Sequence, residues 1–237
     1  MAADTAADLR DRDIVVTGGS GALGAAVLET LLARGATCHV PVMEPEVPAH
    51  FALAAHERVR ATPGVDLGNE AAVRAFYGAL PRLWGSIHLA GGFAMQPLTD
   101  TTLDEFDRMM RMNAVTCFLC CREAVRAMRG AGRGGRLVNV AARPALRPVG
   151  GMVAYSASKS VVAAITQALG EELVADGILC NAVLPSTIDT AANRRSMPDA
   201  DHASWPKPAE IAETIAFLVS PRNALTSGAL LPVFGRA

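Results

Sequence analysis

The sequence predicts one α/β domain over residues 1–237, built on a single doubly wound parallel sheet of about seven strands with helices on both faces. Short uncharged apolar runs, typical of strands buried on both faces, alternate with longer stretches of helical periodicity. The first such run leads directly into a glycine-rich turn. Hydrophobic residues make up 51% of the 237 residues, which is enough for a large core.

The first predicted strand, at 14–16, is followed by a turn that spells G-x-G-x-x-G at Gly19, Gly21 and Gly24. A helix with one apolar face follows over 25–33. Glycine in this position lets a pyrophosphate reach the backbone N–H groups at the helix N-terminus, where the helix dipole favours negative charge. Because the motif lies between a strand and a helix, it predicts a dinucleotide site in preference to an ordinary turn.

The later elements follow in the order that a doubly wound sheet requires. Predicted strands cover 36–42, 58–61, 86–90, 136–141, 178–184 and 229–233, and predicted helices cover 47–56, 69–80, 103–128 and 154–175. Pro41 donates no ladder hydrogen bond, so we expect it near the end of the second strand. An acid often follows this strand to bind a ribose 2′-hydroxyl, but Val42 stands there, followed by Met43 and Glu44, with no arginine nearby for a 2′-phosphate. The choice between NAD and NADP stays open.

Composition excludes several classes of partner. A net charge of −1 gives no general attraction to nucleic acid or to an anionic membrane, and no apolar run is long enough to span a bilayer. The aspartate-rich start, 1–13, lacks the apolar core of a secretion signal, so we expect a soluble cytoplasmic protein. The five histidines show no ligand spacing, and the cysteines are expected to be reduced core thiols, so no metal site is predicted. These cysteines are Cys38, Cys117, Cys120, Cys121 and Cys180.

Tyr155 and Lys159 lie one turn apart on one face of the predicted helix 154–175. An ammonium close to a phenol favours its ionised form, and a tyrosine tuned in this way can exchange a proton near neutral pH. Spacing alone usually marks a surface pair, so the interpretation depends on the motifs around it.

Ordered motifs over nearly the whole chain resemble the short-chain dehydrogenase/reductase family: the turn 17–24, Ala90-Gly91, Asn113, the segment 155–159 and Leu184-Pro185. The resemblance implies a Rossmann-type oxidoreductase domain that binds NAD or NADP, acts on a small-molecule substrate and forms a homotetramer or homodimer. It implies Tyr155 as proton donor or acceptor, Lys159 on the nicotinamide ribose, and Asn113 holding a water of the proton relay. The expected cofactor-binding residues are Gly18, Gly19, Ser20, Gly21, Ala22, Leu23, Gly24, Val42, Asp66, Leu67, Ala90, Gly91, Gly92, Tyr155, Lys159, Pro185, Ile188 and Thr190.

The sequence departs from the family at its usual catalytic serine, because the position thirteen residues before Tyr155 holds Ala142. The quinonoid dihydropteridine reductase branch of the family resembles this chain in two ways: it has the motif found here at Gly18–Gly24, and it lacks the serine. The stretch after Pro185 is also similar to that branch and resembles part of a substrate lid at about 190–207. Two functions are therefore weighed. One is hydride transfer to a planar or activated C=N, quinonoid or carbonyl substrate, and the other is a catalytically idle dinucleotide-binding sensor.

Overall fold

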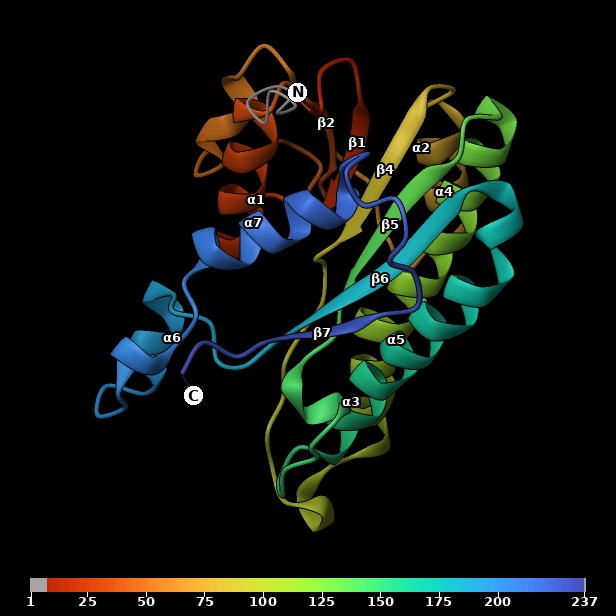
Figure 1. Cartoon of the computed structure of the whole chain (residues 1–237). Helices are drawn as coiled ribbons and strands as arrows, with labels where there is room; N and C mark the ends of the chain where they lie inside the picture. Colours follow the sequence, from red (N-terminus) through yellow and green to blue (C-terminus); the bar gives the residue numbers. More distant parts are fainter. Residues whose placement is uncertain (1–7, 237) are drawn as a thin grey trace.

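The computed structural model describes residues 8–236. Residues 1–7, within the segment expected not to be a secretion signal, lie outside the described residues. Seven parallel strands form one sheet in the order β3-β2-β1-β4-β5-β6-β7 (Figure 1). The strand order reverses between β1 and β4, as in a doubly wound sheet. The strands are β1 Asp13–Thr17, β2 Thr37–Pro41, β3 Val59–Thr62, β4 Leu83–His88, β5 Gly135–Val140, β6 Ile178–Pro185 and β7 Leu230–Val233.

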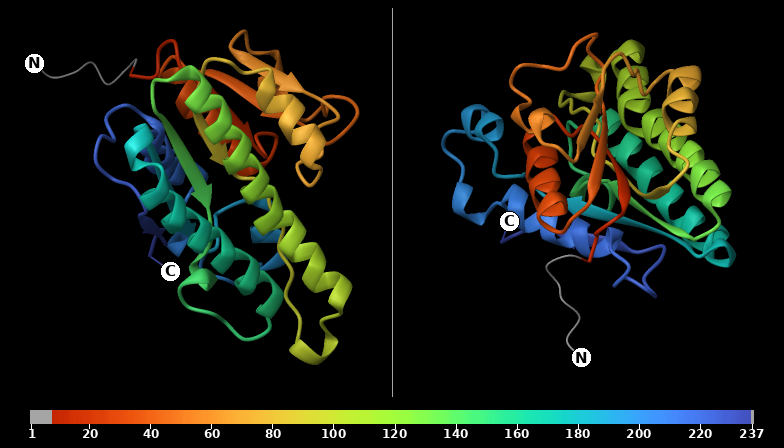
Figure 2. Two further views of the ribbon diagram at one scale, coloured as in Figure 1. Left: turned by 90° about the vertical axis from the view of Figure 1, so that its right-hand side faces the viewer. Right: turned by 90° about the horizontal axis from the view of Figure 1, so that it is seen from above.

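Helices cover both faces of the sheet, and each face has its own core (Figure 2). Apolar residues of α1 and α7, such as Leu28 and Ile215, pack with one face of the strands. Residues of α2, α4 and α5, such as Tyr77, Leu119 and Val162, pack with the other. The helices are α1 Ala22–Ala33, α2 Glu70–Gly78, α3 Leu103–Met109, α4 Thr116–Ala131, α5 Val153–Glu172, α6 Ala191–Ser196 and α7 Pro208–Val219, with a π-helical segment, η4 Met110–Val115, joining α3 to α4.

The predicted fold class is confirmed, although several of its helices differ from the prediction. The expected helix at 47–56 is wrong, since only a short 3-10 turn, η2 Ala52–Ala55, forms there. Pro48 lies in the predicted first turn, and its neighbour is biased away from helical geometry. The helix α7 was not predicted, although Pro208 at its first position and Glu210 two residues later are typical helix-start signals.

Because all seven strands are parallel, their carboxyl ends meet at one edge of the sheet, and the loops that follow them are gathered there. These loops hold the predicted cofactor-binding residues outside the helices. Pro41 is the last residue of β2, as expected. None of the helices in residues 8–236 is long and apolar enough to cross a bilayer.

Candidate active site

The glycine turn between β1 and α1 is shaped by close backbone packing. Gly18 has a φ of +67°, and a Cβ on it would lie 2.9 Å from the backbone nitrogen of Ala90, at the end of β4. A Cβ on Gly24 would lie 2.2 Å from the Gly18 oxygen, and one on Gly19 would lie 2.8 Å from a Val40 methyl group. These three glycines are required by the protein's own packing.

Gly21 is different, because the protein does not need a glycine there. Its φ is −82°, and a Cβ would find only the Gly18 oxygen, at 3.4 Å. Gly21 is the N-cap of α1, whose first turn has no side-chain cap and no acidic residue. The absence of a Cβ therefore leaves open the space in front of uncapped N–H groups, which fits a bound pyrophosphate.

Residues expected near the adenosine lie after β2 and β3. Val42 is buried and accepts a hydrogen bond at its carbonyl from the Val65 N–H (2.9 Å). Asp66 is exposed, with Oδ1 accepting from the Gly68 N–H (2.8 Å), and Leu67 follows it in the same loop. The pairing of the two loops places Val42 and Asp66 on neighbouring parts of the sheet edge.

Asn113 joins the loop after β4 to the helices behind it. Its Oδ1 accepts from the Gly92 N–H (3.0 Å), and its Nδ2 donates to the Gly92 oxygen (3.1 Å) and to Ser158 Oγ (3.0 Å). A Cβ on Gly91 would lie 2.4 Å from Asn113 Oδ1 and 3.4 Å from Lys159 Nζ. Ala90, Gly91 and Gly92 therefore run past both predicted catalytic partners of Tyr155.

Lys159 is buried on α5 and donates from Nζ to the Val140 carbonyl, 2.8 Å away at the end of β5. No carboxylate lies within ion-pair distance of Lys159 among the described residues. Burial lowers its pKa to about 8, an effect partly offset by the Cys117 thiol. The ammonium is thus held at the carboxyl end of the sheet with one carbonyl as its partner.

The net direction of the Tyr155 pKa is opposite to the lowering expected from Lys159. Burial raises the pKa of Tyr155 to about 12, because desolvation disfavours the phenolate. The Phe93 ring contributes to this enclosure, since it meets the Tyr155 ring edge to face with 5.0 Å between their centroids. In this environment Tyr155 is a neutral phenol at pH 7.

Ala142 follows β5 and is buried, and the Lys159 bond to Val140 docks α5 against this same strand end. Ser158 does not replace the missing hydroxyl, because its fully buried Oγ donates to the Tyr155 backbone oxygen (2.8 Å) and accepts from Asn113. Ser156 Oγ is also buried, on the helix next to Tyr155, and has no hydrogen-bond partner.

The segment after β6 contains the last predicted cofactor-binding residues. Pro185 ends β6, Ile188 lies in the next loop, and Thr190 caps α6 by accepting at Oγ1 from the Asn193 N–H (3.2 Å). The two ends of the segment are tied together by the Asp189 N–H, which donates to the Pro206 oxygen (2.9 Å). The stretch expected to be a lid therefore forms a closed loop, with its ends, Asp189 and Pro206, bonded to each other near the sheet edge.

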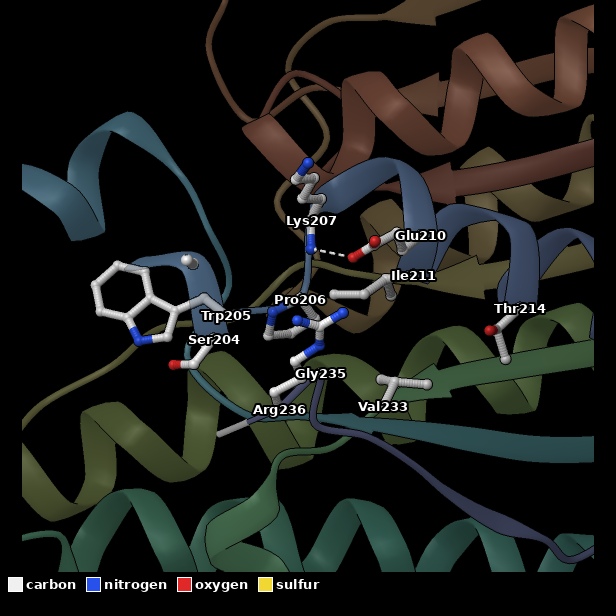
Figure 3. A pocket seen from close by; sticks show the side chains of 11 residues that line it. Ser204, Trp205, Pro206, Lys207, Glu210, Ile211, Thr214, Val233, Gly235 and Arg236 are labelled. Atoms are coloured by element: carbon white, nitrogen blue, oxygen red, sulfur yellow. Dashed lines mark hydrogen bonds between the residues drawn. The ribbon is translucent and has the colours of Figure 1, made fainter. Parts of the chain in front are cut away.

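A cavity of about 680 Å³ lies beside this segment, between the start of α7 and the chain around β7 (Figure 3). Trp205 is buried at its wall, and its ring is tilted against that of His202 with the ring centroids 4.6 Å apart. Neither the glycine turn nor the Tyr155–Lys159 pair lines this cavity. The cavity and the predicted catalytic pair are separate features.

All five cysteines are free and buried, which agrees with the expected core role. The structure brings Cys117 together with Cys121, not Cys120, with 4.0 Å between the two sulfurs. Ligand-type atoms of these two residues and His88 all lie within 4.8 Å of one another, and His88 Nδ1 is 2.7 Å from Asn139 Oδ1. Sequence spacing missed this cluster, because His88 lies on β4 whereas the two cysteines lie on α4. Its atoms have hydrogen-bond partners, and the absence of a metal stays a prediction.

Fold and site together define an α/β dinucleotide-binding domain with a tyrosine–lysine pair at the carboxyl edge of its sheet. The model of the short chain dehydrogenase family matches residues 12–201, and the chain belongs to this family. It is therefore an oxidoreductase of a family that typically binds NAD or NADP.

Relatives are similar over most of the chain. A 3beta-hydroxysteroid dehydrogenase of Mediterraneibacter gnavus is 30% identical over 197 residues, covering 80% of this chain and 70% of the relative. A cyclopentanol dehydrogenase of a Comamonas species is 29% identical over 248 residues, covering 96% and 97%. A solved short-chain dehydrogenase/reductase from Mycobacterium ulcerans has a TM-score of 0.87 at 25% identity, covering 96% of this chain and 90% of that one.

Proposed function

We propose that this protein uses NAD(H) or NADP(H) to transfer a hydride to a small planar or activated acceptor, such as a C=N, quinonoid or conjugated carbonyl compound. Ala142 carries this proposal. The residues of the glycine turn and the loops after β2, β3, β4 and β6 would hold the dinucleotide, and the nicotinamide would supply the hydride. Gly21 supports this binding, because the protein's own packing does not require a glycine there.

The proton step is assigned to Tyr155. Its phenol carries the proton to be donated at pH 7, because burial raises its pKa to about 12. Lys159, held between Val140 and Gly91, would favour the phenolate that is left after donation. Asn113 would position a water for re-protonation, as the family resemblance implies.

The substrate class follows from the residue after β5. A reduced ketone leaves a localised oxyanion, and the loss of one donor to such an oxyanion costs about 10²–10³ in rate. An acceptor that is already electron-poor leaves less localised charge and needs that donor less. Phe93, 58% exposed and packed on Tyr155, offers an aromatic surface beside the proton donor. The resemblance to the dihydropteridine reductase branch points to the same kind of acceptor.

The alternative is a sensor that binds a dinucleotide without turnover. Ala142 is compatible with it. A sensor has no use for a proton donor, however, and the chain has Tyr155 together with Lys159, bonded to Val140, and Asn113, bonded to Ser158. Hydride transfer is therefore the preferred function.

The decisive experiment compares acceptors and hydroxyl variants by the rate of NADH and NADPH oxidation. We expect quinonoid and iminium acceptors to be reduced faster than aliphatic ketones, and Ala142→Ser to accelerate ketones by about tenfold or more with less effect on the preferred acceptor. Ala141→Ser is the matched control, because Ala141 belongs to the core cluster under α4 and α5. Wild-type reduction of ketones at rates equal to those of activated acceptors would contradict the substrate class.

Tyr155→Phe tests the proton step in the same assay. It should lower turnover by about 10²–10³-fold with nucleotide affinity nearly unchanged. Lys159→Ala should lower both. Turnover of no acceptor by the wild-type protein, with a nucleotide bound, would favour the sensor.

The homotetramer or homodimer and the lid at 190–207 remain proposals. Light scattering would test the oligomeric state.

A further inference from the structure

Three side chains of metal-ligating types converge in the core from two elements that are distant in the sequence. Cys117 and Cys121 lie one turn apart on α4, and His88 is the last residue of β4. All three are buried, and one ligand atom from each lies within 4.8 Å of the other two. In residues 8–236 no other set of three histidines, cysteines or acids gathers in this way.

The separations within this cluster are close to those of a tetrahedral metal site. The two sulfurs are 4.0 Å apart, and Cys121 Sγ is 3.5 Å from His88 Nδ1. Zn²⁺ binds sulfur at about 2.3 Å and imidazole nitrogen at about 2.0–2.1 Å, so its tetrahedral coordination separates two sulfurs by about 3.8 Å and a sulfur from a nitrogen by about 3.6 Å. Small shifts of these side chains would bring all three atoms to one ion.

The far side of the His88 ring is held as a metal-binding histidine requires. His88 Nε2 is 2.8 Å from Ser86 Oγ, which is 2.8 Å from the Tyr77 hydroxyl. A metal-binding histidine generally donates its other N–H to such a partner, which fixes the tautomer and the orientation of the ring. Nδ1, the nitrogen that faces Cys121, is then the one that binds the metal.

Asn139 is placed to supply a fourth ligand. Its Oδ1 lies 2.7 Å from His88 Nδ1 and 3.5 Å from Cys121 Sγ, and its Nδ2 donates to Thr166 Oγ1 (2.9 Å), which fixes the direction of the amide. A proton on Nδ1 would bond to this oxygen in the metal-free protein, and a metal ion would take the place of that proton. Two thiolates balance the charge of a divalent ion, so the loaded site would be neutral, which reduces the cost of burying it.

We infer that Cys117, Cys121 and His88 bind Zn²⁺, with Asn139 Oδ1 as the fourth ligand. The inference goes against the absence of a metal that spacing along the chain predicts, and it is independent of the proposed function. The ion would join the carboxyl end of β4 to α4, just before the predicted cofactor-binding segment 90–92. With four protein ligands the site is closed, so its role is to stabilise the fold.

The test measures zinc in the purified full chain. Because the ligands are buried, the protein is produced in a medium supplemented with zinc, so that the site can load during folding, and is then dialysed under reducing conditions. We expect about one zinc per chain by elemental analysis, and a melting temperature about 5 °C or more above that of protein produced with added Mg²⁺ alone. Protein produced with Co²⁺ should show the near-ultraviolet absorption of a cobalt–thiolate bond.

Cys120→Ala is the matched control for Cys121→Ala, because Cys120 is equally buried on the same helix and lies outside the cluster. Cys121→Ala should lower the zinc content by at least about tenfold and abolish the cobalt–thiolate absorption, whereas Cys120→Ala should retain both. Zinc content that is unchanged in Cys121→Ala, or equally reduced in Cys120→Ala, would overturn the inference. If Cys121→Ala does not fold, the wild-type cobalt spectrum decides, since absence of the thiolate band would equally overturn it.

Discussion

Gly21 is the residue at which ligand binding and folding can be separated. Gly21→Val should leave the melting temperature nearly unchanged, because its φ of −82° suits any residue and a Cβ meets no protein atom closer than 3.4 Å. Nucleotide affinity should fall by at least about tenfold, since the side chain would displace the phosphate from charge-assisted hydrogen bonds worth about 1.5–3 kcal/mol. Calorimetry and thermal unfolding measure the two effects.

The matched control is Gly78→Val at the exposed end of α2, where a Cβ meets nothing within 4 Å. That variant should keep full nucleotide affinity. Unchanged affinity in a folded Gly21→Val protein would show that the phosphate lies elsewhere.

Lys159, in its proposed catalytic role, would be a residue that serves activity at a cost in stability. Its pKa in the folded protein is about 8, below the ordinary value of 10.5, because burial disfavours the ammonium. Below pH 8 the lysine is charged in both states, so the full cost of burying the charge is present. Between pH 8 and 10.5 the folded protein loses the proton while the unfolded chain retains it, so the cost fades as pH rises.

Lys159→Met should therefore stabilise the apoprotein at pH 7 by about 1–3 kcal/mol while abolishing turnover. The gain should shrink as pH rises from 8 toward 10.5. Urea unfolding of both proteins at pH 7 and pH 10 measures it. A variant that is less stable than wild type at pH 7 would mean that the bond to Val140 outweighs desolvation.

At the scale of single elements, the π-helical segment Met110–Val115 contains Asn113, one of the predicted catalytic residues. Such segments often occur at functional sites, and this one holds Asn113 against Gly92 and Ser158. Asn113→Leu should lower the free energy of unfolding by about 2–4 kcal/mol, because it leaves several buried polar groups without partners. It should also weaken nucleotide binding, since the loop after β4 loses its anchor.

Asn69→Ala provides the comparison for Asn113. Asn69 caps α2 through one bond to the Ala72 N–H (3.0 Å), so its loss should cost about 1 kcal/mol and leave nucleotide affinity unchanged. Urea unfolding and nucleotide titration of both variants provide the measurements. Equal losses in the two variants would show that Asn113 is only a local cap.

The elements also show where periodicity succeeds and where it fails. The long helix predicted at 103–128 forms as α3, η4 and α4, yet no pattern indicates the π segment, which depends on the Asn113 contacts. The prediction of a helix at 47–56 gave too little weight to Pro48. The helix α7 has an apolar face that packs on α1, and its sequence signals are confined to Pro208 and Glu210 at its start.

For the whole molecule, the alternation of strands and helices was sufficient to predict a parallel sheet, and a parallel sheet necessarily gathers its loops at one edge. The placement of the predicted cofactor-binding residues follows from that geometry. The direction of the Tyr155 pKa does not, because it depends on enclosure by residues such as Phe93. The cavity near Trp205 and the contact of His88 with Cys121 likewise depend on tertiary packing between distant segments.

The burial of every cysteine has a practical consequence for labelling the protein with a fluorescent dye. Because the described surface carries no thiol, a single cysteine introduced at an exposed position would be the only group open to a maleimide dye. Asp199, exposed in the closed loop between Asp189 and Pro206, is such a position. A fluorophore placed there would report movement of that loop, and none of the protein's own cysteines would have to be removed first.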